Sequence, residues 1–256
     1  MDECVCIVLA AGKGKRMQTG KTLLQKVLAR IQDKPMLGYV LDVVEAARIR
    51  RVIVVVGHQS DSVRGYLERS RKHLSIETVE QTELSGTADA VKRALPRLAN
   101  YQGDILILYG DTPLLTEKTL RRLIETHRSQ RNACTLLTTL LNDPTNYGRI
   151  VRNKTGSVSK VVEELDATPD EKKIQEINVG AYCFEAQALF ESLREVKPLN
   201  RKGEYYLTDT ILILSQKNRM VQSVSTDDQV EIMGINSPED LQKARRALSN
   251  RSTVKP

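Results

Sequence analysis

Tryptophan is absent from this 256-residue chain, and phenylalanine occurs only twice. Proteins that bind single-stranded nucleic acid stack successive bases on aromatic side chains, so a chain with so few aromatic rings is poorly equipped for that role. Apolar runs such as 52–56 and 105–108 are also much shorter than the roughly 20 residues that a transmembrane helix needs. We therefore expect neither a membrane partner nor a nucleic-acid partner.

Cysteine and histidine are also scarce. The four cysteines form no C-x-x-C pair, and each lies in an apolar, strand-like stretch (Cys4, Cys6, Cys134 and Cys183). We expect buried, reduced thiols rather than disulfides or a metal site. The three histidines are isolated, so we predict no histidine site. Because residues 2 and 3 are acidic, the chain does not begin like a signal peptide, and we expect a cytoplasmic protein.

Positive charge is in excess, with 39 Lys and Arg against 32 Asp and Glu, for a net charge of +7. This excess alone favours anionic partners, which include nucleotides, nucleic acid and acidic lipid headgroups. At 256 residues the chain is long enough to bury a large core, and we expect one domain over 1–256.

The first loop is the most informative stretch. Residues 5–17 read V-C-I-V-L-A-A-G-K-G-K-R-M, a short apolar strand followed by small residues and three cations. Small residues let the backbone approach a ligand closely, and its N–H groups together with lysine and arginine attract phosphate. The spacing matches neither the G-x-G-x-x-G fingerprint nor the Walker A loop. The pattern therefore predicts a phosphate-binding turn of another type.

Apolar strands and amphipathic helices alternate along the rest of the chain. We predict strands at 51–57, 76–79, 104–109, 133–141 and 176–184, and a hairpin from 149–152 and 157–163. We predict helices at 23–31, 35–48, 88–98, 116–128 and 237–249. One more helix should be capped by Ser60 or Asp61. This order predicts an α/β fold whose mostly parallel sheet has helices on both faces. Ligands bind at the carboxyl ends of such strands, so Gly12 and Asp111 should share one edge of the sheet.

Seven segments carry a resemblance to a known family. They read L-A-A-G-K-G-K-R-M (9–17), K-V-L (26–28), K-P-M (34–36), Y-G-D-T-P-L (109–114), D-P-T-N-Y-G-R-I (143–150), I-Q-E-I-N-V-G (174–180) and G-E-Y-Y-L-T-D (203–209). Together, from about residue 5 to 248, they resemble the N-acetylglucosamine-1-phosphate uridylyltransferase family, in particular the uridylyltransferase half of its bifunctional bacterial members. The first motif marks only the wider sugar nucleotidyltransferase group, whereas the last two are more specific.

The resemblance implies a Rossmann-like domain that uses Mg²⁺. It would join UTP and N-acetylglucosamine 1-phosphate into UDP-N-acetylglucosamine and pyrophosphate, a step of cell wall precursor synthesis. The nucleotide-binding part would span about 1–115, a smaller β-rich lobe for the sugar phosphate about 116–235, and a C-terminal helix about 237–249. Oligomerisation is left open.

The resemblance also implies a role for individual residues. Arg16 and Lys26 would be the catalytic cations, and Asp111 and Asn236 would hold Mg²⁺. The nucleotide would contact Leu9, Ala10, Ala11, Gly12, Gln81, Gly86, Thr87 and Gly110. The sugar phosphate would contact Gly148, Glu163, Asn178, Tyr205 and Thr208. Carboxylate and amide oxygens are the ligands that a hard cation prefers, and a hydroxyl-rich sugar needs hydrogen-bonding side chains.

The chain departs from the family pattern at four positions. Gln25 stands where the family has proline, after a longer connection from Arg16, and Lys15 replaces a usual threonine. Asp89 replaces a common histidine, and Leu165 a common polar or basic residue. The family's left-handed β-helix, with its acetyltransferase activity, has no room here, so the two activities reside on separate chains or this chain is a fragment.

Two other functions remain open from the sequence. One is the same fold with another substrate pair, such as glucose 1-phosphate or a deoxythymidine nucleotide. The other is a non-catalytic RNA-binding protein, which the positive charge would suit.

Overall fold

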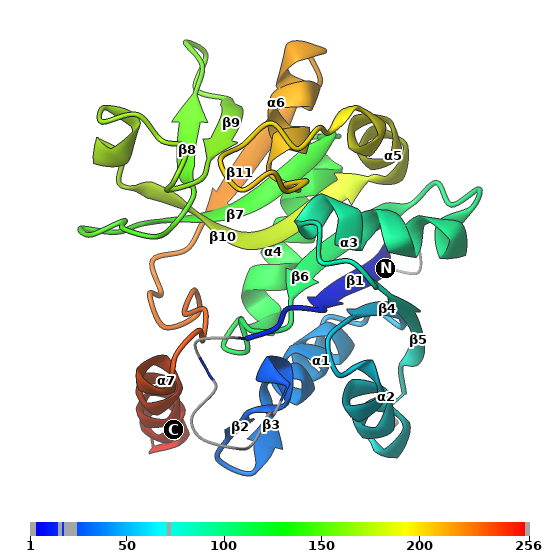
Figure 1. Cartoon of the computed structure of the whole chain (residues 1–256). Coiled ribbons are helices and arrows are strands. Elements are labelled where there is room, and N and C mark those ends of the chain that lie inside the picture. The colour runs from blue at the N-terminus through cyan, green and yellow to red at the C-terminus, as the bar shows by residue number, and fades with distance from the viewer. Residues whose placement is uncertain (1–3, 15–16, 18–24, 71–72, 254–256) are drawn as a thin grey trace.

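One sheet organises the molecule (Figure 1). The computed structural model describes residues 4–14, 17, 25–70 and 73–253, with side chains to residue 250. Its main strand order is β11-β7-β10-β6-β1-β4-β5, and β8 and β9 branch from β10. The bounds are β1 Cys4–Ala10, β4 Arg51–Val56, β5 Ser75–Glu80, β6 Asp104–Tyr109, β7 Cys134–Leu140, β8 Arg149–Arg152, β9 Val158–Val162, β10 Glu176–Glu185 and β11 Val221–Ser225, with a separate two-stranded pair of β2 Arg30–Ile31 and β3 Lys34–Pro35.

Along the main strand order, four of the six pairings are parallel, and the two pairings of the long strand β10 are antiparallel. The branch formed by β8 and β9 is antiparallel as well. β1 is parallel to β4 and β6, β4 to β5, and β7 to β11. β10 runs antiparallel to β6, β7 and β8. The predicted α/β class with a mostly parallel sheet is therefore confirmed.

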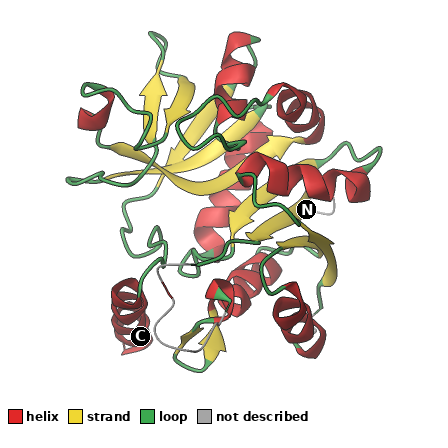
Figure 2. Ribbon diagram, in the orientation of Figure 1, coloured by secondary structure: helices red, strands yellow, loops and turns green. Residues whose placement is uncertain are grey.

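Helices cover both faces of the sheet (Figure 2). Their bounds are α1 Met36–Ala46, α2 Ser60–Arg69, α3 Thr87–Ala94, α4 Glu117–Ser129, α5 Ala186–Glu195, α6 Asp209–Gln216 and α7 Pro238–Thr253. Successive side chains of a strand point to opposite faces, so Ile7 packs with α3, α5 and α6, whereas Val8 packs with α1, α2 and α4. Among the described residues, no helix is long and apolar enough to cross a membrane.

Several local predictions are confirmed. The strand at 104–109 has the predicted bounds, the hairpin forms from β8 and β9, and Thr116 caps α4 by accepting a hydrogen bond from the Thr119 N–H at 3.3 Å. All four cysteines are buried and unpaired. The strand expected at 176–184 forms as β10, and it changes its register against β7 between Asn178 and Tyr182.

Other local predictions are wrong. The described part of the helix expected at 23–31 is a single 3₁₀ turn, Lys26–Leu28, followed by β2. Neither Ser60 nor Asp61 caps α2, because its N-cap is Gln59 in a left-handed conformation. α3 ends at Ala94, since Pro96 lacks the N–H that would continue it, and the chain continues as a 3₁₀ turn, Leu95–Leu98. α7 continues to Thr253, beyond its expected end near 249.

Gly180 makes room for a tyrosine at the end of β6. Its φ is +89°, and a Cβ added there would lie 2.4 Å from Cδ2 of Tyr109. A side chain at this position would therefore displace the ring of Tyr109 as well as strain the backbone.

We expect Gly180→Ala to lower the free energy of unfolding by about 3 kcal/mol, because overpacking adds to backbone strain. Gly156→Ala is the matched control, since Gly156 has a similar φ of +83° but nothing within 4 Å of the added Cβ. It should cost only about 1 kcal/mol. Urea denaturation measures both, and equal losses would contradict the role of Tyr109.

Candidate functional site

A cavity of about 330 Å³ opens at the carboxyl ends of β1 and β6. Its lining includes ten of the residues that the sequence analysis singled out, namely Leu9, Ala10, Ala11, Gly12, Lys26, Gln81, Gly86, Thr87, Asp111 and Asn236. These residues come from segments that are up to 227 positions apart (236 − 9). The parallel sheet brings them together because its strands end at the same edge.

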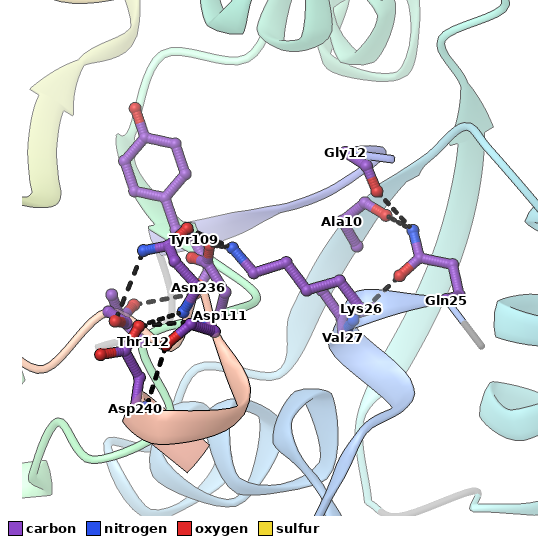
Figure 3. Close-up of polar contacts among 12 residues, drawn as sticks. Ala10, Gly12, Gln25, Lys26, Val27, Tyr109, Asp111, Thr112, Asn236 and Asp240 are labelled. Atoms are coloured by element: carbon purple, nitrogen blue, oxygen red, sulfur yellow. Dashed lines mark hydrogen bonds and ion pairs between the residues drawn. The ribbon is translucent and has the colours of Figure 1, made fainter. Parts of the chain in front are cut away.

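Lys26 lies between the two predicted metal ligands (Figure 3). Its ammonium forms an ion pair with the Asp111 carboxylate and donates a hydrogen bond of 2.7 Å to Oδ1 of Asn236. The side chains of Lys26 and Asp111 are only 11% and 26% exposed, so this contact is partly shielded from water. Two oxygen atoms thus converge on one positive charge, and such a donor pair suits a hard divalent cation that keeps substrate oxygens among its other ligands.

The backbone of residues 235–240 holds Asn236 beside Asp111. The Ile235 N–H donates a 2.9 Å hydrogen bond to the Asp111 carbonyl. Oδ2 of Asp240 accepts 3.0 Å hydrogen bonds from the N–H groups of Asn236 and Ser237, and Ser237 Oγ accepts one of 3.2 Å from the Asp240 N–H. This reciprocal arrangement is a capping box at the start of α7. It fixes the segment that carries Asn236.

Gln25 ties the first loop to Lys26 (Figure 3). Its side chain is buried, with the residue 1% exposed. Its Nε2 donates to the carbonyls of Ala10 at 2.9 Å and Gly12 at 3.1 Å, while its Oε1 accepts from the Val27 N–H at 2.9 Å. The sequence analysis noted Gln25 only as a departure from a family pattern. No local signal reveals its role, because its acceptors lie 13 and 15 positions away.

Gln81 and the turn after β5 form the opposite wall. Nε2 of Gln81 donates to the Gly86 carbonyl at 2.9 Å and to Oδ2 of Asp89 at 2.8 Å. Gly86 has a φ of +119°, and a Cβ added to it would lie 2.3 Å from the Tyr205 carbonyl oxygen. The close approach of two backbone segments therefore requires glycine here.

Tyr205 supports this wall and is not part of the lining of the first cavity. Its N–H donates to the Ser85 carbonyl at 2.7 Å, and its carbonyl accepts from the Ala88 N–H at 2.8 Å. Oγ1 of Thr87 accepts from the Leu207 N–H at 2.8 Å. The ring of Tyr205 lies 4.9 Å from the Lys92 ammonium.

A second cavity, of about 790 Å³, adjoins the first and shares three lining residues with it, Thr87, Tyr109 and Asn236. Of the residues predicted for the sugar phosphate, Glu163 lines this cavity, and the Leu165 side chain lies beside it. Tyr109 and Lys202, which the sequence analysis did not select, also line it. Neither has a local sequence signal, because Tyr109 reads as the end of a strand and Lys202 as a loop residue.

The other predicted sugar contacts are set back from both cavities. Thr208 is buried and donates a 3.0 Å hydrogen bond to Oε1 of Glu163. Gly148 lies next to the Glu163 carboxylate, since a Cβ added to Gly148 would be 3.5 Å from both carboxylate oxygens. Asn178 donates to the Tyr182 hydroxyl at 2.6 Å and accepts from the Gly180 N–H at 3.2 Å, so both ends of its amide are engaged.

Gly110 and Arg16 are the two remaining residues predicted for the nucleotide and for catalysis. The N–H of Gly110 donates to the Leu9 carbonyl at 2.9 Å, so Gly110 joins the ends of β1 and β6 behind the first cavity. Arg16 lies outside the described residues, as does Lys15.

Three acidic groups, Glu163, Asp166 and Asp209, line a further cavity, and Glu163 also lines the second one. Burial is the main cause that raises the pKa of Glu163, against the opposing hydrogen bond from Thr208. Burial, followed by the charges of Glu163 and Asp166, raises the pKa of Asp209 to about 6. Protonation of Asp209 near this pH therefore relieves repulsion among the three carboxylates.

We expect Gln25→Leu to lower the free energy of unfolding by about 2–3 kcal/mol, because the Gly12 and Ala10 carbonyls and the Val27 N–H lose their partner. Urea denaturation measures the loss, and hydrogen exchange should show faster exchange of the Val27 amide. Gln187→Leu is the control, since Gln187 is exposed and bonds only Glu191 within its own helix. A loss no larger than that of the control would show that Gln25 does not hold the loop.

Comparison with known proteins places this chain in a family. The family model described as nucleotidyl transferase matches residues 5–232. The "Bifunctional protein GlmU" of Pelotomaculum thermopropionicum is 41% identical over 249 residues, which are 97% of this chain and 53% of the relative. The protein of the same name from Shouchella clausii is 43% identical over 245 residues, 96% of this chain and 52% of the relative. The chain thus spans about half the length of these curated relatives.

A solved structure supports the fold alone. The chain resembles a UDP-glucose pyrophosphorylase in complex with UDP-glucose with a TM-score of 0.80, at 17% identity, over 98% of this chain and 100% of that one. The sheet, the site at its edge and the match over residues 5–232 agree with one another. The chain therefore belongs to the nucleotidyl transferase family.

Proposed function

We propose that the chain transfers a uridylyl group from UTP to N-acetylglucosamine 1-phosphate, giving UDP-N-acetylglucosamine and pyrophosphate. The single observation that carries the proposal is the meeting of Lys26, Asp111 and Asn236 at the junction of two cavities. The names of the relatives, bifunctional GlmU proteins, agree with the motifs at 174–180 and 203–209 that carry the sequence resemblance.

The nucleotide would occupy the first cavity. The small side chains of Ala10, Ala11 and Gly12 allow its phosphates to approach the backbone, and the Lys26 ammonium neutralises part of their charge. Gln81, with the backbone of Gly86 and Thr87, would face the edge of the uracil ring. The contacts of Tyr205 and Leu207 hold this segment rigid, so little freedom is lost on binding.

The sugar phosphate would occupy the second cavity. Glu163 offers carboxylate oxygens to sugar hydroxyls, and Thr208 orients it. Lys202, which belongs to the same lining, supplies a positive charge on the side where Leu165 lacks one. Thr87, Tyr109 and Asn236 belong to both linings, so the two substrates would meet beside them.

The reaction needs positioning more than an activated nucleophile. An oxygen of the sugar phosphate is already anionic at neutral pH, and it attacks the α-phosphorus while the bond to the bridging oxygen of pyrophosphate breaks. Repulsion between the two anions opposes their approach, and Lys26 reduces it by its charge. Mg²⁺, held by Asp111 and Asn236, supplies further positive charge to the phosphate oxygens when it is bound.

We expect pyrophosphate release with UTP, N-acetylglucosamine 1-phosphate and Mg²⁺. The kcat/KM for N-acetylglucosamine 1-phosphate should exceed that for glucose 1-phosphate by about a hundredfold. Glucose 1-phosphate lacks the acetamido group, so the polar groups of the site that would bond this group have no partner when it binds. A coupled assay for pyrophosphate measures both. Equal values, or a preference for another nucleoside triphosphate, would overturn the substrate assignment but not the family.

We expect Asp111→Asn to cut turnover by about a hundredfold or more and to raise the Mg²⁺ concentration needed for half-maximal rate, since a neutral amide is a weaker ligand than a carboxylate. Asp61→Asn is the matched control, because Asp61 is a fully exposed aspartate on α2. Turnover within about threefold of the parent at every Mg²⁺ concentration would remove Asp111 from the site.

A further inference from the structure

The amide of Gln81 has a fixed orientation. Its nitrogen donates to two oxygens, the Gly86 carbonyl at 2.9 Å and Oδ2 of Asp89 at 2.8 Å. A backbone carbonyl and a carboxylate can only accept hydrogen bonds, so the opposite orientation of the amide would place oxygen against two oxygens. The chemistry of the neighbours therefore dictates which end of the amide faces them.

The carbonyl oxygen of Gln81 is consequently the atom offered to the first cavity. Gln81 lines this cavity and is only 4% exposed. Among the described residues, Oε1 of Gln81 has no hydrogen-bond donor. The atom faces the cavity, so water can satisfy it in the absence of a ligand. A ligand that displaces this water must bring an N–H to the same point, or it leaves the oxygen without a partner.

Two sources of positive charge lie beside the Asp89 carboxylate. The Arg93 guanidinium lies 3.1 Å from its other carboxylate oxygen, one helical turn later. Asp89 also lies in the first turn of α3, where the partial positive charge of the helix N-terminus favours an anion. A hydrogen bond from Gln81 to this carboxylate is stronger than one to the Gly86 carbonyl, which already accepts from the Ala90 N–H at 3.1 Å.

We propose that Asp89 is a positioning residue that sets the selectivity for the base by fixing the amide of Gln81. The proposal rests on the proposed function, because it takes the first cavity as the nucleotide site. Asp89 itself does not line that cavity, and its side chain is 14% exposed. It therefore acts on a nucleotide through Gln81 and not by contact.

The bases differ at the point that faces Oε1. The N3 atom of uracil carries a hydrogen and donates, whereas N3 of cytosine is a bare acceptor and would repel a carbonyl oxygen. Thymine carries the same N3–H as uracil. Fixing the amide thus favours uracil over cytosine, partly by an unfavourable contact with the wrong base, and makes no distinction between uracil and thymine.

The test is the ratio of kcat/KM for UTP to that for CTP. In Asp89→Ala the amide of Gln81 can reverse and present its N–H₂ to N3 of cytosine, so the ratio should fall by about tenfold. The ratio for UTP to dTTP should stay within about twofold of the parent, because both bases present N3–H. Asp89→Asn keeps a neutral acceptor and should fall between the parent and Asp89→Ala.

A double-mutant cycle separates action through Gln81 from other effects. In the Gln81→Ala background, Asp89→Ala should cause no further change in the UTP to CTP ratio, because the group that it orients is gone. Asp61→Ala is the control, since Asp61 also lies in the first turn of a helix and pairs with an arginine, three positions later at 3.6 Å. It should leave both ratios unchanged.

Each outcome decides the proposal. An equal loss with UTP and CTP in Asp89→Ala would mean that Asp89 only supports α3. A further drop in the ratio in the Gln81→Ala background would mean that Asp89 acts without Gln81. Either result would overturn the role proposed for Asp89. The proposed function would stand as long as the parent enzyme uses UTP. A parent chain that shows neither turnover nor equilibrium binding of UTP would overturn the proposed function itself.

Discussion

The contact of Lys26 with Asp111 and Asn236 depends on three segments that are remote in sequence. Lys26 follows the first loop, Asp111 lies two residues after β6, and Asn236 precedes α7. A carboxylate and an ammonium that are mostly shielded from water need each other, since removing one partner leaves a buried charge uncompensated. The sheet edge, the first loop and the start of α7 are therefore arranged around one electrostatic centre.

Hydrogen bonds to the backbone keep this centre in place. Gln25 joins the carbonyls of the first loop to the turn that carries Lys26, and the Ile235 N–H joins Asn236's segment to the Asp111 carbonyl. Such contacts orient the charged side chains without placing additional charge in the cavity. A site built on strand ends and braced by backbone contacts is more precise than one on free loops.

The core of the fold could be predicted from the sequence because its signals are local. β4 and β6 are nearly continuous apolar runs, which is the pattern of strands buried on both faces. α6 has no such signal, because Ile211 to Leu214 are four consecutive apolar residues that fit a buried strand as well as a helix. α5 begins after Glu185 without a side-chain cap, so its start is not marked either.

The site itself could be predicted only in part, for a related reason. Loop residues with a pattern of their own, such as Gly12 and Asp111, were found, and the structure brings them into one lining. Gln25 was missed as a structural residue, since its acceptors are set by the tertiary fold. Asp89 was noted as unusual, but its hydrogen bond with Gln81 was not foreseen. The two residues are only eight positions apart, yet Gln81 follows β5 and Asp89 lies in the first turn of α3, so the contact depends on how the turn between these elements folds.

The shared lining of the two cavities constrains any reaction between ligands that they hold. Tyr109 and Asn236 line both cavities. The absence of a side chain at Gly180 leaves the space that the Tyr109 ring fills. Lys26 lines the first cavity and contacts Asn236, which belongs to both linings, so its positive charge lies next to the junction. Two anionic ligands benefit most from this arrangement, because the lysine lowers the repulsion at the point where they meet.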